Sequence, residues 1–365
     1  MPEIRKLDIS GSPFEMGQQH GVAYADDIRK LAEERIHLSS DKNWTGHQLL
    51  RQQVLALGEA CLPYHQDYAP DLMDELHGMS NVTGVSLTDL VILNGFTDFI
   101  DTIYNYEATG VPVAAHPAVD NCTAFIVSPN ATAKGQGFYG QTWDMHATAT
   151  PFVILLHGKP ANGLRFLTLT IIGCVGMIGV NEAGIAIGIN NLLAGDGQIG
   201  VTWPFVIRKA LAQDNLDDAL ACITNTKLAG GHNYMLADAF GRGYNVEAMS
   251  TRYHIEEVTN GSVVHTNHCL YNCNIEVERE RLPQSKESST ARLSRGQELL
   301  NRGQITLNDL FALTRDHGTG KGICVHPEAP FFVESCSAAI MRPATKEMWT
   351  VWGNPCQNEY KRFVV

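Results

Sequence analysis

The apolar residues of this 365-residue chain change their spacing near residue 121, and that change limits the folds open to it. Before it, helical spacing predicts a helix from a capping box at Ser12, a second helix from residue 50 that stops at Pro63, and a third over 86–100. The stretch 107–121 is weakly patterned and is typical of a surface loop or linker. The first third of the chain is therefore predicted to be mainly helical.

Beyond residue 121 the pattern is that of strands. Short runs rich in β-branched and aromatic residues alternate with Gly and Pro, and a few helical segments separate them. The predicted strands are 123–127, 138–145, 152–157, 165–171, 185–192, 233–240, 244–249, 262–266, 331–341 and 348–352, and the predicted helices are 203–213, 216–224, 290–301 and 307–316. Runs of strands and then of helices favour an α+β fold, with antiparallel sheets covered by helices, over a parallel βαβ sheet.

Charge and composition exclude several classes of function. The chain has 27 Lys and Arg against 39 Asp and Glu, so it has no electrostatic attraction to nucleic acid or to an anionic membrane. No apolar run approaches the ~18 residues of a spanning helix, and charges occupy the place of a signal-peptide core. The nine cysteines, an odd number, include several inside apolar runs, which is typical of reduced thiols. We expect a soluble, cytoplasmic protein.

Neither nucleotide nor metal binding has a persuasive motif. The Gly-rich stretch 173–200 lacks the spacing of a nucleotide-binding loop, so we interpret its glycines as turns between strands. Two groups of residues have the chemistry of zinc ligands but not the paired spacing of a zinc motif. They are His317, Cys324 and His326, and His265, His268, Cys269 and Cys273. We interpret both groups as structural and predict no metal and no cofactor.

Cys122 follows the predicted linker and opens the first predicted strand, within Asp120-Asn121-Cys122-Thr123. Position alone favours a buried structural thiol, but further motifs follow in order along the chain. They are Gly11-Ser-Pro-Phe-Glu-Met-Gly17, Gly140-Gln-Thr-Trp-Asp144, Asn181-Glu-Ala-Gly184 with Asn190-Asn191, His265-Thr-Asn-His268, Asp316-His317, Ile323-Cys-Val-His326 and Gly353-Asn-Pro-Cys356. With them the sequence resembles the acyl-coenzyme A:6-aminopenicillanic-acid acyltransferase family, relatives of the choloylglycine hydrolases among the N-terminal-nucleophile hydrolases.

The resemblance implies a four-layer αββα sandwich and a maturation step. Cleavage before Cys122 would leave a helical segment, 1–121, associated with a catalytic domain, 122–365. The usual residue before the cysteine is glycine, and here it is Asn121. Because asparagine also adopts positive φ more readily than most residues, we expect cleavage to occur, at a reduced rate.

Cleavage would give one residue two catalytic groups. The thiol of Cys122 has an ordinary pKa near ~8.5, and its freed α-amino group, with a pKa of roughly 7.7–8.0, could act as its base. By resemblance, Asp144 would orient that amino group, and Asn267 and Asn191 would stabilise an oxyanion. Arg292 would keep the neighbourhood of the thiol electropositive.

Some assignments stay open. Asn190 is the alternative to Asn191, since adjacent strand residues face opposite sides, and Arg295, one helical turn away, is the alternative to Arg292. We interpret His116, His265 and His268 as structural residues, although each could assist in cleavage or in substrate binding.

The leading hypothesis is a self-processing amidohydrolase that cleaves a small N-acyl amide through a thioester on Cys122. The same intermediate could pass its acyl group to an amine such as a β-lactam nucleus, which would make the protein an acyltransferase. Other hypotheses are an uncut hydrolase that pairs Cys122 with His265 or His268, and a non-catalytic scaffold or zinc-binding module. The expected partners are the small substrate and the cleaved N-terminal fragment, and association into a homo-oligomer stays open.

Overall fold

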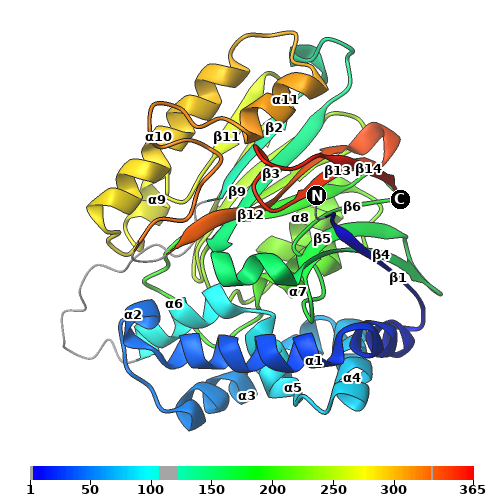
Figure 1. The fold of residues 1–365 in the computed structure, drawn as a ribbon, viewed down its shortest axis with the longest axis vertical. Coiled ribbons are helices and arrows are strands. Elements are labelled where there is room, and N and C mark those ends of the chain that lie inside the picture. Colours follow the sequence, from blue (N-terminus) through cyan, green and yellow to red (C-terminus); the bar gives the residue numbers. More distant parts are fainter. Residues whose placement is uncertain (1–2, 107–121, 330–331) are drawn as a thin grey trace.

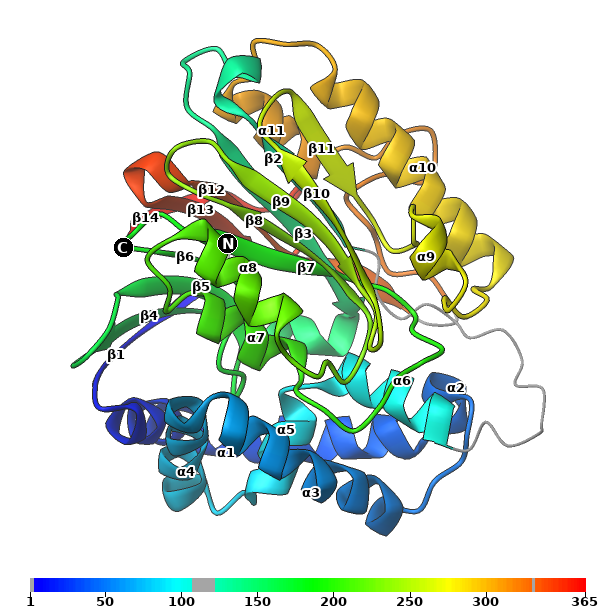
Figure 2. The same cartoon turned by 180° about the vertical axis from the view of Figure 1, so that it is seen from behind.

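The computed structural model describes residues 3–106, 122–329 and 332–365. Two sheets lie face to face, and helices cover the outer face of each (Figures 1 and 2). Helices α7 (Trp203–Ala210) and α8 (Leu216–Thr224) pack on the larger sheet, and α10 (Pro283–Leu300) and α11 (Leu307–Thr314) on the smaller one. This is the predicted four-layer αββα arrangement.

The larger sheet has eight strands, in the order β1-β4-β5-β6-β7-β8-β9-β10. All neighbours are antiparallel except β1 and β4, which run parallel. The strands are β1 (Arg5–Gly11), β4 (Val153–Pro160), β5 (Phe166–Ile171), β6 (Ile178–Asn181), β7 (Ala186–Asn191), β8 (His232–Ala237), β9 (Gly243–Ala248) and β10 (Tyr253–Val258). The sequence did not predict β1, β6 or β10.

The smaller sheet has six antiparallel strands, in the order β11-β2-β3-β12-β13-β14. They are β2 (Thr123–Val127), β3 (Phe138–His146), β11 (Ser262–His265), β12 (Val333–Arg342), β13 (Glu347–Trp352) and β14 (Lys361–Val364). A short helix, α9 (Asn272–Ile275), links β11 to α10. The predicted strands 123–127 and 138–145 are confirmed, and β14 was not predicted.

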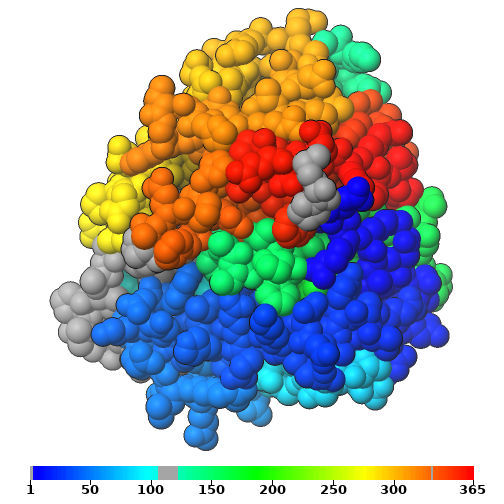
Figure 3. Space-filling view, in the orientation of Figure 1, coloured from blue at the N-terminus to red at the C-terminus, as the bar shows by residue number. Residues whose placement is uncertain are grey.

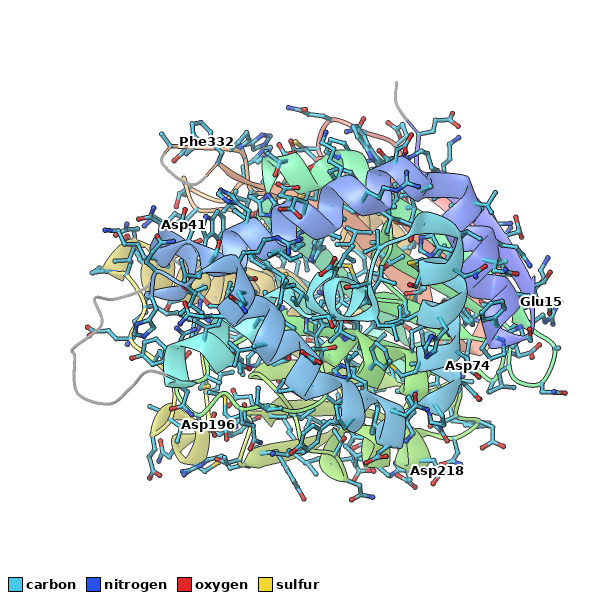
Figure 4. All side chains as sticks on the ribbon, turned by 90° about the horizontal axis from the view of Figure 1, so that it is seen from below. Glu15, Asp41, Asp74, Asp196, Asp218 and Phe332 are labelled. Carbon is cyan, nitrogen blue, oxygen red and sulfur yellow. The ribbon has the colours of Figure 1, made fainter. Side chains whose placement is uncertain are left out.

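The N-terminal helices form one bundle at the end of the sandwich (Figures 1 and 3). They are α1 (Pro13–Ser40), α2 (Lys42–Thr45), α3 (Arg51–Tyr68), α4 (Pro70–Thr83), α5 (Leu87–Leu93) and α6 (Phe96–Tyr106). The predicted capping box is present, because the Ser12 amide donates to Glu15 at 2.8 Å and the Glu15 amide donates to the Ser12 hydroxyl. Figure 4 shows Glu15 at the start of α1 and Asp41 beyond its end.

Two helix predictions were wrong. Helix α3 continues through Pro63, which lies on its exposed side, because the buried face goes on from Cys61 to His65. The helix predicted over 86–100 is broken at Asn94, whose side-chain amide donates to the carbonyl oxygens of Leu90 and Gly173, at 2.9 Å each. The helix therefore ends at Asn94, whose side chain binds the backbone of the loop at Gly173.

Strand β2 is apolar along its whole length because both of its faces are buried. Ala124 and Ile126 belong to the large core between the two sheets, whereas Phe125 and Val127 belong to a second core beneath α10 and α11. Cys122, immediately before β2, also belongs to the first core. Within the described ranges, no helix is long and apolar enough to cross a membrane, and no disulfide joins any of the nine cysteines.

Candidate active site

The candidate site forms where β2 begins. Cys122 is buried, with 1% of its surface exposed. Thr123 pairs with Thr142 of β3, and its backbone amide also donates to the Thr142 hydroxyl at 3.1 Å. The position of Cys122 is therefore fixed by the ladder of the smaller sheet.

A fully buried arginine of α10 binds this strand start. The guanidinium of Arg292 donates through Nη1 to the carbonyl oxygen of Cys122 at 2.6 Å and to the Thr123 hydroxyl at 3.0 Å. Its Nη2 donates to Oδ1 of Asn267 at 2.9 Å. The alternative, Arg295, instead pairs with Asp316 and Glu298 and is 30% exposed. Of the two arginines, Arg292 is the one in contact with Cys122.

Asn267 is held from both ends of its amide. Its Oδ1 accepts from Arg292, which fixes the orientation of the group, and its Nδ2 donates to the carbonyl oxygen of Asn191 at 3.1 Å. Arg281 donates to the same oxygen at 3.4 Å. The second N–H of Asn267 has no hydrogen-bond acceptor among the described residues. Asn267 is thus an oriented donor beside Cys122.

Asp144 lies on β3, two residues beyond Thr142, next to the start of β2. The carboxylate is fully buried and accepts from the hydroxyl of Ser335 at 2.7 Å and from that of Thr142 at 3.4 Å. Ser335 pairs with Asp144 across the β3–β12 ladder, just before the register shifts between Ser335 and Ser337. Because the shift leaves Cys336 without a partner in the ladder, Ser335 is the residue that lies opposite Asp144.

Asn190 and Asn191 lie on opposite faces of β7. A Cβ at Gly188 would meet Tyr139 and Gln141 of β3, so the face shared by Gly188 and Asn190 is turned toward the smaller sheet. Asn191 pairs with His232, whose side chain contacts Thr97 of α6. Asn191 contacts Asn267 through its backbone carbonyl oxygen, which accepts from the Asn267 side chain.

The two histidines next to Asn267 form hydrogen bonds with residues other than Cys122. His265 binds Glu247 through Nε2 and the carbonyl oxygen of Thr266 through Nδ1, at 2.9 Å each. His268 places Nδ1 2.7 Å from the hydroxyl of Ser289, and that hydroxyl also accepts from the backbone N–H of Asn267. Both histidines therefore support the segment that carries Asn267, and His265 has no ring nitrogen left for Cys122.

The electrostatics of this segment follow from its burial. Burial, together with the charges of His265, Arg281 and Arg292, lowers the pKa of His268 to about 4, so this ring is neutral at pH 7. Burial would raise the pKa of Glu247, but the hydrogen bond and charge of His265 outweigh it and hold that pKa below its ordinary value. The segment after β11 that carries Asn267 therefore lies between the carboxylate of Glu247 and the neutral imidazole of His268.

Two hollows adjoin the cluster. One, of about 650 Å³, lies between α10 and the loop 317–329, and Ser288 on its wall accepts from Arg292 at 3.4 Å. The other, of about 30 Å³, is lined by Trp143, Met145, Phe96 and Arg35. The first has a mixed polar and apolar lining and is large enough for a small substrate, and the second is a narrow apolar cavity beside β3.

The sequence did not identify Ser335, Ser289 or Arg281 as members of the site. Their spacing from Cys122 has no pattern, because Ser335 is placed by the register of β12, Ser289 by the packing of α10, and Arg281 by the segment that precedes α10. Of the predicted residues, Asn121 and His116 lie outside the described residues.

Two curated proteins illustrate what this chain is similar to. A protein of Emericella nidulans, "acyl-coenzyme A:6-aminopenicillanic-acid-acyltransferase 40 kDa form", is 28% identical over 73% of this chain and 70% of its own length. An uncharacterized protein of Archaeoglobus fulgidus is 26% identical over 65% of this chain. The matched part spans only 41% of the archaeal protein.

Solved structures resemble the chain more distantly. A conjugated bile acid hydrolase from Clostridium perfringens has a TM-score of 0.44 and 10% identity, over 67% of this chain and 97% of its own. Penicillin V acylase from Agrobacterium tumefaciens has a TM-score of 0.39 and 12% identity, over 63% of this chain and 82% of its own. The fold assignment depends on the two sheets and their covering helices, not on these similarities.

One family model matches residues 131–357, which include Asp144, Asn191, Asn267 and Arg292. The match covers more than half of the chain and begins just after β2. The chain belongs to the acyl-coenzyme A:6-aminopenicillanic acid acyl-transferase family.

Proposed function

We propose that this protein is an N-terminal-nucleophile amide hydrolase in which Cys122, freed by cleavage of the 121–122 bond, attacks a small N-acyl amide. The observation that carries the proposal is the position of Cys122 at a strand start that a buried arginine links to an oriented amide donor. Membership of an acyl-transferase family supports acyl chemistry at that thiol.

Maturation begins with the thiol of Cys122. Its sulfur adds to the carbonyl carbon of Asn121, the C–N bond breaks, and a thioester forms while the amine takes up a proton. Water then hydrolyses the thioester, which leaves a carboxylate on Asn121 and both a thiol and an α-amino group on Cys122. Arg292 holds the carbonyl oxygen of Cys122 and so keeps the strand start in place during these steps.

Catalysis uses the same residue twice. The α-amino group takes the thiol proton, the thiolate adds to the carbonyl carbon of the substrate, and the proton passes to the leaving amine as the C–N bond breaks. The unused N–H of Asn267 donates to the oxyanion, a contact that is often worth ~3–4 kcal/mol. Asp144 orients and stabilises the ammonium form of the α-amino group, and water finally releases the acid from the thioester.

Transfer to an amine is the second candidate function, and the family supports it directly. The thioester formed on Cys122 is the same, but an amine acceptor replaces water and forms a new amide. Hydrolase and transferase therefore differ in what occupies the acceptor position, for which the larger hollow beside Ser288 is the candidate.

Hydrolysis of a panel of N-acyl amides, with and without an added amine acceptor, tests both candidates. The wild type should release acid, or form the new amide when the acceptor is present, and Cys122→Ala should do neither. Cys273→Ala is the matched control, because Cys273 is exposed and outside the site, and it should keep full activity. Undiminished activity in Cys122→Ala would overturn the proposal.

A further inference from the structure

Four potential metal ligands, brought from three places in the sequence, meet on the surface beside α10. The ligand atoms of His317, Cys324, His326 and Cys356 all lie within 4.8 Å of one another. The sequence pattern contained only the first three, and Cys356 joins them because the turn after β13 folds back against the loop before β12. The orange and red segments that carry these turns adjoin on the face shown in Figure 3.

The distances from Nε2 of His326 to two of the other ligand atoms approach those of a tetrahedral site, and all four atoms lie within 4.8 Å of one another. Nε2 of His326 lies 3.0 Å from Nε2 of His317 and 3.4 Å from Sγ of Cys356. Zinc bonds of ~2.0–2.3 Å to nitrogen and sulfur place neighbouring ligands of a tetrahedron roughly 3.3–3.8 Å apart. Two imidazole nitrogens that face each other share at most one proton, whereas a cation accepts the lone pairs of both.

We propose that His317, Cys324, His326 and Cys356 bind one Zn²⁺ ion that ties the loop before β12 to the turn after β13. Two thiols and two imidazoles are a ligand set that favours zinc over magnesium or calcium. Four protein ligands leave no open position for water, so the site is structural. The proposal does not depend on the reaction at Cys122.

The surrounding hydrogen bonds hold both halves of the site in register. Asn354 donates through Nδ2 to the carbonyl oxygen of Val325 at 2.9 Å, and Arg315 donates through Nε to that of Pro355 at 2.9 Å. These contacts position Cys324 and Cys356 without the ion. His317 is exposed, and His317, Cys324 and His326 line one wall of the 650 Å³ hollow, which provides a path for the ion from solvent.

The proposed ion would also stabilise a contact of the candidate active site. The Val325 amide donates to the Ser335 hydroxyl at 2.9 Å, and that hydroxyl donates to Asp144 at 2.7 Å. Because Cys324 and His326 flank Val325 in the chain, fixing both of them fixes the amide that orients Ser335.

Metal analysis of the full chain, purified without a polyhistidine tag, is the first test. Wild type and the control Cys273→Ser should each contain about one zinc ion per chain. Cys324→Ser and His317→Ala should lower the affinity for zinc by more than the ~10–100-fold lost when an outer-sphere partner is removed. Equal zinc content and affinity in all four proteins would overturn the proposal.

A second measurement uses only the wild type, so it does not depend on whether a variant folds. After removal of metal with a chelator, titration with Co²⁺ should give the visible absorption of a tetrahedral thiolate site, saturating at one equivalent, and Zn²⁺ should abolish it. The proposal is wrong if no such absorption develops, or if thiol counting on the denatured, unreduced protein finds two thiols missing because Cys324 and Cys356 form a disulfide.

Discussion

At the scale of single residues, Arg292 links more of the candidate site than any other side chain described above. It is fully buried, and its hydrogen bonds reach Cys122, Thr123 and Asn267. A lysine has a single ammonium and cannot form the same fork of contacts. The residue therefore acts through geometry as well as through charge.

We expect Arg292→Lys to lower kcat/KM for amide hydrolysis by at least ~10-fold, which is about 1.4 kcal/mol of the barrier. An unpaired Asn267 carbonyl should also cost ~1–3 kcal/mol of folding free energy. Arg295→Lys is the matched control, because that side chain is partly exposed and an exposed ion pair contributes only ~0.2–1 kcal/mol. Kinetics and urea unfolding of both variants check this, and equal effects would contradict the role of Arg292.

Asp144 is expected to raise the pKa of the α-amino group of Cys122, because an opposite charge favours the ammonium form. Asp144→Asn keeps the shape of the side chain and removes that charge. The acid limb of the kcat/KM profile should therefore move to lower pH, and the maximal rate should fall. Ser335→Ala leaves the charge in place and should shift the limb less, whereas a profile unmoved in Asp144→Asn would show that the carboxylate does not face the base.

At the scale of elements, the two sheets approach each other closely at Gly188 of β7. A Cβ at this position would lie 2.2 Å from the Tyr139 hydroxyl and 2.4 Å from Oε1 of Gln141. Gln141 in turn donates through Nε2 to the carbonyl oxygen of Ile189 and so bridges the sheets. The absence of a side chain at residue 188 is what permits this bridge.

Gly188→Ala should therefore destabilise the fold by ~1–3 kcal/mol, the usual cost of overpacking. Gly137→Ala is the control, since a Cβ there comes no closer than 3.2 Å to any neighbour. Urea unfolding monitored by circular dichroism measures both variants. Equal stability of the two would mean that the sheets separate at little cost.

Burial on both faces helps to make a strand predictable, although the short strand β6, which is also fully buried, was missed. Strand β2 consists of apolar and β-branched residues throughout, and β3 begins with the aromatic pair Phe138 and Tyr139. Strands β1 and β10 lie at the two edges of the larger sheet, and their alternation of exposed and buried positions includes charged residues, which weakens the signal. Strand β1 is recognised as a strand only from its hydrogen bonds to β4, a segment far away in the sequence, so its own residues do not predict it.

The site was predictable to a similar extent. Cys122, Asp144, Asn267 and Arg292 could be proposed because motifs surround them, and the structure brings them together. Ser335 could not be, because its place depends on a register shift in β12. Cys356 lies thirty residues from His326, and only the fold of the C-terminal turn adds it to the metal group.

At the scale of the whole molecule, several histidines are buried in the neutral form. Burial lowers the pKa of His20 and His65 to about 4 and that of His232 to about 3, and all three are fully buried. A base whose folded-state pKa lies below its unfolded value of ~6.5 binds more protons when the chain is unfolded. The stability that these residues contribute is therefore complete above pH ~6.5 and is lost as the pH falls toward 4.

We expect the free energy of unfolding to decrease between pH 7 and pH 5 by at least ~1.4 kcal/mol, the equivalent of a tenfold change in proton affinity. His232→Gln cannot take up a proton and should show a smaller decrease, although it is less stable at pH 7. His77→Gln, an exposed control, should keep the wild-type decrease. Urea unfolding at the two pH values measures these free energies. A wild-type stability that is constant or rises toward pH 5 would show that the buried histidines do not stabilise the fold in their neutral form.

The proposed maturation concerns the whole chain, since the protein would work as two associated fragments with Cys122 at a new N-terminus. Intact-mass measurement under denaturing conditions, with N-terminal sequencing, tests it on wild type and Cys122→Ala. We expect two wild-type fragments whose masses sum to the full chain plus one water, with the larger beginning at Cys122, and a single uncut chain for Cys122→Ala. An uncut wild type that hydrolyses amides, or a cut Cys122→Ala, would contradict it.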